Sequence, residues 1–177
     1  MNLTEKTISS KTIYEGKVLT VKVDEVELFD KSRSKREIVE HGGGACVLAV
    51  YENKIPLVEQ FRYAYNQTLW ELPAGKIEKG EQGLVCAKRE LVEETGLWAE
   101  ELVLLNVLYP SPGYTNEKIY LYFAEKTCKV EQKLDSGEFL NVKFFTVDEI
   151  LKMIDSGEIC DAKTIVAVYK YLLMQKS

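Results

Sequence analysis

The chain has 177 residues, of which 46% are hydrophobic, 29% charged and 10% aromatic, a composition typical of one folded globular domain and too apolar for disorder. Its net charge of -5 argues against binding to a DNA or RNA backbone, which favours a basic face. The N-terminal residues MNLTEKTISSKTIYEG lack the apolar core of a signal peptide, and no apolar run approaches the roughly 20 residues of a membrane span. We therefore expect a cytoplasmic protein that binds neither nucleic acid nor membranes.

The first half of the chain predicts β-strands. Residues 11–30 alternate valines with charged residues, as in strands with one solvated face, and the polar residues 31–37 predict a connection. The apolar runs at 45–51 and 54–63 predict two strands joined by a short turn at Glu52 and Asn53.

The second half predicts helices between further strands. A helix follows Gly80, and strands are expected near 101–109, 118–125 and 141–147. Thr146 and Glu149 have the spacing of a capping box for a short helix, and Asp161 is a suitable N-cap for a last helix that ends near residue 174. The class is α+β, with residues 1–40 as a small N-terminal antiparallel β-sheet and residues 41–177 as the main domain.

The cysteines are far apart and form no C-x-x-C pair. This spacing argues against a zinc site and against a disulfide framework, so we expect four reduced and buried thiols: Cys46, Cys86, Cys128 and Cys160.

The segment RELVEETG, residues 89–96, gathers three glutamates on one stretch of the predicted helix. At about 100° per residue, one stripe can be buried, and it contains Leu84, Ala87, Leu91 and Thr95. The glutamates lie on the adjacent arc: Glu90, Glu93 and Glu94. A solvated helix face is the simplest explanation of such a run, but carboxylates at the edge of a core repel one another unless a cation neutralises them. Oxygen ligands favour Mg²⁺ or Mn²⁺.

The flanking residues complete a longer pattern, G-x5-E-x7-R-E-U-x-E-E-x-G-U, in which U is a bulky aliphatic residue. Every fixed position is filled, by Gly75, Glu81, Arg89, Glu90, Leu91, Glu93, Glu94, Gly96 and Leu97. The segment resembles the signature of the Nudix hydrolase superfamily. That resemblance implies an α/β/α sandwich with a mixed central sheet, and metal-dependent cleavage of a nucleoside diphosphate linked to another moiety.

The resemblance also implies roles for individual residues. Glu90 and Glu94 are the expected metal ligands, together with the carbonyl of Ala74. Glu93 beside them and Arg89, which supports them through ion pairs, are assigned to the catalytic group. Arg89 lies four residues before Glu93, so it can hold that carboxylate by a charge-assisted hydrogen bond.

Other segments resemble the ADP-ribose pyrophosphatase branch of the superfamily. Pro112 lies sixteen residues after Gly96 and precedes Gly113, and Arg62 follows Gln60 and Phe61 in VEQFRY. The branch implies that Arg62, Pro112 and Gly113 contact the substrate. It implies hydrolysis of ADP-ribose to AMP and ribose 5-phosphate, in a homodimer that exchanges its N-terminal sheets.

The chain departs from its branch at two places. The segment HGGGACV replaces the more usual H-P-G-A-V, so we expect His41 to be a turn or packing residue and not a base. In KLDSGEFLNV a serine, Ser136, lies between Asp135 and Glu138, in a loop that supplies the catalytic base or another metal contact in relatives. We assign Glu138 as the group that positions or deprotonates the attacking water.

Two alternatives stay open. The same signature serves enzymes that act on another nucleoside diphosphate derivative, a dinucleotide or an oxidised nucleotide. A non-catalytic ADP-ribose sensor is a third hypothesis, although this acidic chain keeps the whole signature.

Overall fold

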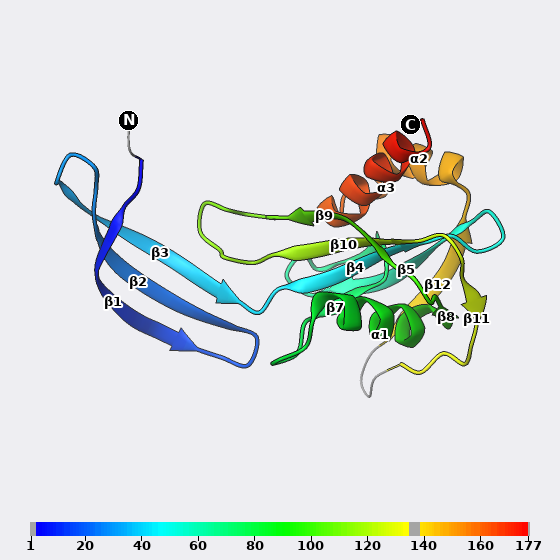
Figure 1. Cartoon of the computed structure of the whole chain (residues 1–177), viewed down its shortest axis with the longest axis horizontal. Coiled ribbons are helices and arrows are strands. Elements are labelled where there is room, and N and C mark those ends of the chain that lie inside the picture. Colours follow the sequence, from blue (N-terminus) through cyan, green and yellow to red (C-terminus); the bar gives the residue numbers. More distant parts are fainter. Residues whose placement is uncertain (1–2, 135–138, 177) are drawn as a thin grey trace. The chain divides into compact units, whose positions relative to one another are not determined.

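The computed structural model describes residues 3–134 and 139–176, and the chain forms two compact units (Figure 1). Unit 1 contains residues 1–43 and 109–118, and unit 2 contains residues 44–108 and 119–177. The domain boundary expected after residue 40 stays a prediction, because compactness alone does not define which part folds or functions independently. Among the described residues, no helix has both the length and the apolar character required to cross a bilayer.

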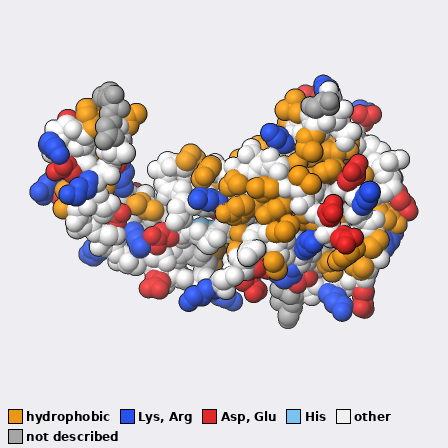
Figure 2. Space-filling model, in the orientation of Figure 1, with side chains coloured by type: hydrophobic (Ala, Val, Ile, Leu, Met, Phe, Trp, Pro, Cys, Tyr) orange, Lys and Arg blue, Asp and Glu red, His pale blue; other side chains and the backbone are white. Residues whose placement is uncertain are grey.

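Unit 1 is built on a three-stranded antiparallel sheet in the order β1-β2-β3. Its strands are β1 (Lys6–Glu15), β2 (Leu19–Glu27) and β3 (Arg33–His41). The expected connection at residues 31–37 is therefore wrong, since most of it belongs to β3. Its charged side chains pair across the sheet, as in the 3.5 Å contact from Arg33 Nη1 to Glu25 Oε1, so their polarity does not prevent strand formation. Charged residues are interspersed over this sheet (Figure 2).

The segment at 109–118 is fastened to the last strand of this sheet. The backbone N–H of Val39 donates to the carbonyl of Tyr114 at 2.7 Å, and the N–H of Asn116 donates back to Val39 at 3.2 Å. The N–H of His41 donates to Oδ1 of Asn116 at 2.9 Å. These bonds fix the segment that carries Pro112 and Gly113.

Unit 2 contains two larger sheets and one short ladder. The first sheet is mixed, in the order β7-β4-β10-β9, and β4 and β10 are its parallel pair. Its strands are β4 (Gly44–Ala49), β7 (Ala74–Lys76), β9 (Val103–Leu108) and β10 (Ile119–Ala124). The second sheet, in the order β12-β5-β6, contains β5 (Ile55–Arg62), β6 (Gln67–Glu71) and β12 (Leu140–Phe145). The ladder pairs β8 (Leu97–Trp98) with β11 (Cys128–Lys129).

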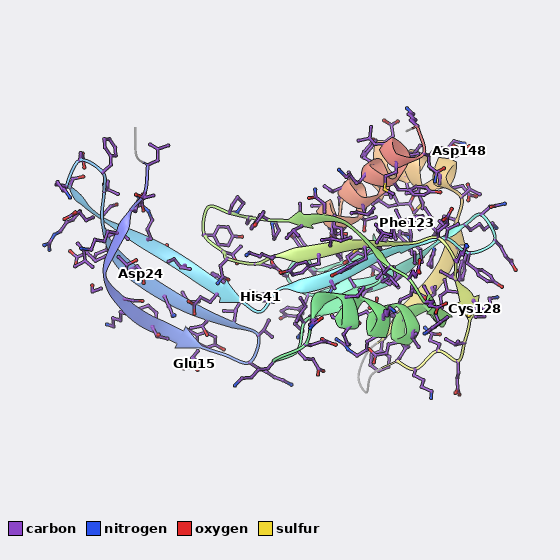
Figure 3. All side chains as sticks on the ribbon, in the orientation of Figure 1. Glu15, Asp24, His41, Phe123, Cys128 and Asp148 are labelled. Atoms are coloured by element: carbon purple, nitrogen blue, oxygen red, sulfur yellow. The ribbon has the colours of Figure 1, made fainter. Side chains whose placement is uncertain are left out.

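Helices cover both faces of the mixed sheet. The three helices of the described chain are α1 (Gly83–Thr95), α2 (Val147–Asp155) and α3 (Ala162–Met174). Strand β4 is buried at all six positions. Cys46 and Leu48 pack with side chains of α2 and α3, whereas Ala45 and Val47 pack with α1, because successive side chains of a strand point to opposite faces. Phe123 of β10 lies between the sheet and α3 (Figure 3).

The turn expected at residues 52–53 is present, but it does not make a hairpin. Glu52 and Asn53 have φ values of 49° and 61°, and Tyr51 and Lys54 exchange two hydrogen bonds of 2.9 Å. Beyond that bridge, β4 and β5 belong to different sheets. Since β4 is apolar on both faces, it lies inside the mixed sheet beside β10, as is usual for parallel strands.

The expected helix caps are confirmed. Thr146 and Glu149 form a capping box at the start of α2, and the Asp161 side chain accepts the N–H of Thr164 at the start of α3. Two burial predictions are partly wrong. Leu84 is 39% exposed, because the buried face of α1 begins at Cys86, and the thiols of Cys128 and Cys160 are exposed. All four cysteines are free, as expected.

Candidate active site

The glutamates of the signature lie on α1, whose end is fixed by a glycine. Gly96 adopts φ 64° and ψ 26°, and its N–H donates to the carbonyl of Val92. A left-handed conformation of this kind is strained for residues with a Cβ, which explains a glycine there. The helix buries Glu90 and Glu94, which are 7% and 3% exposed.

Arg89 connects the signature residues to one another. Its Nε donates to Oε1 of Glu81 at 3.1 Å, and its Nη1 donates to Oε1 of Glu90 at 2.6 Å and to Oε2 of Glu93 at 2.9 Å. Its Nη2 reaches the carbonyl of Lys76 at 3.2 Å. The contact between Arg89 and Glu93 that the four-residue spacing predicts is therefore present. One guanidinium orients three carboxylates and the preceding loop.

These bonds also set the ionisation of the groups. The hydrogen bond to Glu81, followed by the negative charge of Glu90, raises the pKa of Arg89 above its ordinary value. The hydrogen bond from Arg89 lowers the pKa of Glu81 below its ordinary value. Both groups are thus charged at neutral pH.

The loop before α1 approaches Glu90 so closely that only glycine fits at position 75. A Cβ on Gly75 would lie 1.7 Å from Oε1 of Glu90. Cys86 supports the same loop, since its thiol donates to the carbonyl of Lys76 at 3.4 Å. Burial raises the pKa of Cys86 to about 12, so the thiol keeps its proton as a donor. The carboxylate of Glu90 therefore lies directly against the backbone.

Glu94 contacts the same loop at Ala74, the residue before Gly75. The backbone N–H of Ala74 donates to Oε2 of Glu94 at 2.8 Å. The carbonyl of the neighbouring Pro73 accepts the N–H of Val47 on β4 at 3.0 Å. The structure thus places Glu94 against Ala74 and Glu90 against Gly75, and the assignment of Glu90, Glu94 and the Ala74 carbonyl as metal ligands stays a prediction.

This arrangement suits a divalent cation. Three glutamates, Glu81, Glu90 and Glu93, pair with the single guanidinium of Arg89, and Glu94 accepts a backbone N–H nearby, so carboxylates outnumber the cation. The Glu90 carboxylate lies against the backbone at Gly75, where a Cβ would lie 1.7 Å from its Oε1. Residues 3–134 and 139–176 contain no group of three or more acidic, histidine or cysteine side chains already gathered as a cage. A hydrated cation that binds through one or two carboxylates and completes its shell with water and phosphate needs no such cage.

Arg62 lies at the end of β5 and has a buried partner that the sequence did not reveal. Its Nε and Nη2 donate to the two carboxylate oxygens of Glu71 at 2.6 and 2.7 Å. Its Nη1 has no hydrogen-bond partner among the described residues, and the side chain keeps 39% exposure. The negative charge of Glu94 contributes to the raised pKa of Arg62, after the larger effect of Glu71. Arg62 therefore lies within electrostatic range of Glu94.

The other expected residues lie elsewhere. Pro112 and Gly113 belong to unit 1, in the segment fastened to β3. His41 ends β3 (Figure 3), and its Nδ1 accepts the N–H of Gly43 at 3.0 Å, a turn contact like that expected. Glu138 lies outside the described residues. The roles of all these residues stay predictions.

Sequence reasoning missed an ionic cluster around the buried Glu71 in unit 2, which also contains Arg62, Asp161 and Lys163. The available signal was a glutamate at the end of the run TLWE, where an apolar strand enters the core. A buried carboxylate requires a cationic partner. The partner on α3 is 92 residues away, which no local pattern reveals.

Two family models match the chain. A NUDIX domain model matches residues 40–166, and a model described as the nucleoside diphosphate sugar hydrolase N-terminal domain matches residues 5–39. With the signature of α1 and the carboxylates it positions, the match is decisive. The chain belongs to the Nudix hydrolase family.

Individual relatives cover almost all of the chain. It is 44% identical to an ADP-ribose pyrophosphatase of Bacillus subtilis (strain 168), over 99% of this chain and 96% of the relative. It is also 44% identical to a methanol dehydrogenase activator of Bacillus methanolicus, over 98% of this chain and 95% of the relative. The crystal structure of an ADP compounds hydrolase matches with a TM-score of 0.87 and 19% identity, over 99% of this chain and 97% of that one. The predicted fold class is confirmed.

Proposed function

We propose that this chain hydrolyses the diphosphate bond of ADP-ribose, with one water, to AMP and ribose 5-phosphate. The observation that carries the proposal is the pair of buried carboxylates, Glu90 and Glu94, held against the backbone at Ala74 and Gly75. The 44% identity to the Bacillus subtilis ADP-ribose pyrophosphatase along nearly the whole chain supports this substrate.

We assign Mg²⁺ as the cation, with Mn²⁺ as a substitute, and Glu90, Glu94 and the carbonyl of Ala74 as the groups that would hold it. When bound, such a cation neutralises charge on a diphosphate and makes a coordinated water more acidic. Arg89 holds the carboxylates of Glu90 and Glu93 in fixed directions, so that little reorganisation accompanies binding.

Groups outside the carboxylate cluster would bind and orient the substrate. The Nη1 of Arg62 is a cationic donor available to a phosphate oxygen, since guanidinium groups suit phosphate recognition. We assign Pro112 and Gly113 to the turn that contacts the substrate. We assign Glu138 as the group that positions the attacking water or accepts its proton.

We further propose a homodimer formed through the N-terminal sheet, in the cytoplasm. Strand β1 is exposed at all ten positions, and Val26 is the only buried hydrophobic residue among the described residues of unit 1. A sheet with so little core needs a second surface to cover it.

The substrate is tested by incubating the purified protein with Mg²⁺ and one of four compounds: ADP-ribose, a guanosine diphosphate sugar, a reduced dinucleotide or an oxidised nucleoside triphosphate. We expect kcat/KM to be highest for ADP-ribose, with AMP and ribose 5-phosphate formed in equal amounts. A preference for the triphosphate would contradict the proposal. Binding of ADP-ribose without products would instead support the sensor hypothesis.

A further inference from the structure

The buried Glu71 carboxylate joins three secondary-structure elements of unit 2. It ends β6 with 2% exposure and receives the two-pronged contact from Arg62 at the end of β5. Its Oε2 also pairs with Nζ of Lys163, in the first turn of α3. Burial alone would raise the pKa of Glu71, but the hydrogen bonds from Arg62 and the charge of Lys163 outweigh it, so the pKa is lowered. The carboxylate is ionised and held from two sides.

The start of α3 also binds the backbone of Leu72, the residue that follows Glu71. Asp161 accepts the N–H of Thr164 at 3.0 Å and its hydroxyl at 2.6 Å, and it pairs with Lys163 at 3.0 Å. The hydroxyl oxygen of Thr164 in turn accepts the N–H of Leu72 at 2.8 Å. One turn of α3 therefore holds Glu71 by its side chain and Leu72 by its main chain.

The same short segment is fastened at its other end to the carboxylate site. The N–H of Ala74 donates to Glu94, and the carbonyl of Pro73 accepts from Val47. Only Pro73 separates Leu72, fixed by α3, from Ala74, bonded to Glu94. A shift of the segment at Leu72 would therefore move the donor that orients Glu94.

Stability alone is a weak reason for this cluster. Removing the charges of Glu71 and Lys163 from water is costly, and well-packed apolar residues often replace buried ion pairs without loss of stability. The hydrogen bonds, however, fix positions within a few tenths of an ångström, which an apolar contact does not. The cluster thus specifies where the segment at 71–74 lies.

We propose that Lys163 and Thr164 of α3 are positioning residues, which hold the segment at 71–74 so that Ala74 and Glu94 are arranged for cation binding. This inference rests on the proposed function for its metal site, but not for its substrate. The expected cost of losing such an outer support is about 10-fold to 100-fold in metal affinity or activity.

The test is Thr164→Val, which keeps the volume of a fully buried side chain and removes the acceptor for Leu72. Free Mn²⁺ is measured by its electron paramagnetic resonance signal in titrations without substrate, together with kcat and KM for ADP-ribose. We expect the Mn²⁺ dissociation constant to rise about tenfold. Thr164→Ser, which keeps the hydroxyl, should restore affinity to within about twofold of the wild type, because the lost acceptor is regained.

Thr146→Val is the matched control for stability. Thr146 caps α2 as part of a capping box, so its loss also weakens a helix start, by about 1 kcal/mol, but it has no bond to the segment at 71–74. We expect normal Mn²⁺ affinity in this variant. A second variant, Lys163→Met, removes the link from α3 to Glu71, together with the pair between Lys163 and Asp161, and leaves Arg62 as the partner of Glu71. It should weaken Mn²⁺ binding in the same direction and serves if Thr164→Val does not fold.

The outcomes separate this inference from the proposed function. Wild-type Mn²⁺ affinity in the folded Thr164→Val or Lys163→Met protein would overturn the positioning role and leave ADP-ribose hydrolysis untouched. A wild type that binds Mn²⁺ without cleaving ADP-ribose would overturn only the substrate. A wild type that fails to bind Mn²⁺ would overturn both.

Discussion

The two units differ most in what their strands bury. In unit 1, β1 is exposed at every position, whereas in unit 2, β4 is buried at every position and packs against helices on both faces. The surfaces differ as well: on the face drawn in Figure 2, charged side chains are spread over the three-stranded sheet, while exposed hydrophobic side chains gather on unit 2.

This difference explains where the chemistry is placed. Glu90 and Glu94 lose hydration on burial, and only a packed helix and a fixed loop can keep such groups in register with Ala74 and Gly75. Unit 1 has no comparable core among its described residues. Unit 2 is therefore the part that can hold a preorganised site. The sheet of unit 1 instead presents exposed side chains, as in β1.

The largest expected effect is the loss of activity in Glu94→Gln. Glutamine keeps an oxygen for the N–H of Ala74 but removes the charge that a cation requires. We expect kcat to fall at least about a hundredfold, the scale for removal of one electrostatic group from a site. Glu101→Gln, at an exposed position before β9, is the control and should be fully active. Nearly full activity of Glu94→Gln at saturating Mg²⁺ would refute the metal assignment.

The pH dependence of stability should distinguish a buried from an exposed ion pair. Because the folded-state pKa of Glu71 is lowered, its contribution is present above the unfolded value near 4.5 and is lost as the pH falls through the folded value. Glu71→Gln should cost about 3–5 kcal/mol at pH 7, since it leaves the buried Lys163 without the charge of Glu71. That cost should shrink in acid.

The control for this measurement is Glu131→Gln in unit 2, which should cost less than about 1 kcal/mol. Glu131 pairs with Lys133 on the surface at 3.7 Å, and solvent screens such pairs. Circular dichroism at 222 nm follows unit 2, which contains all the helices of the described chain. An undiminished cost of Glu71→Gln at pH 3 would show that the carboxylate is not ionised in the fold.

The core of unit 2 is tested by two leucines on one helix. Leu91 of α1 is fully buried between the helix and the mixed sheet, so Leu91→Ala should cost about 2–5 kcal/mol of unfolding free energy. Leu84→Ala, at a position that is 39% exposed on the same helix, should cost less than about 1 kcal/mol. Urea denaturation measures both, and equal costs would contradict the burial described for α1.

The smallest expected effect on the fold comes from substitutions that change only the oligomeric state. If the sheet of unit 1 pairs with a second copy, sedimentation should give twice the chain mass of 20.2 kDa. The double substitution Ile8→Asp and Ile13→Asp, at exposed positions of β1, should yield monomers. Val103→Asp, at an exposed position of β9, should remain dimeric. The reverse pattern would place the interface in unit 2.

Local patterns predicted much of the site. The signature identified the glutamates, the supporting Arg89 and the glycine at position 75, because each depends on spacing along one helix and its loop. The caps at Thr146 and Asp161 were equally readable, since a cap satisfies donors only three residues away.

Patterns failed where the partner is distant in the chain. The polar residues of β3 resembled a connection, because the charges that pair with them lie on another strand. The exposure of Cys128 and Cys160 depends on which surfaces pack, and composition carries no such information.

The sequence by itself determined the helix that carries the glutamates, since helical periodicity and signature spacing are local properties of the chain, and its resemblance to the Nudix signature indicated the class of chemistry. Only the tertiary structure decided that β4 lies beside β10 and that Glu71 meets Lys163 from α3. An apolar strand must pack against other apolar surfaces, and a buried charge must pair with an opposite charge. Both partners come from elements that are distant in the sequence, so no local pattern identifies them.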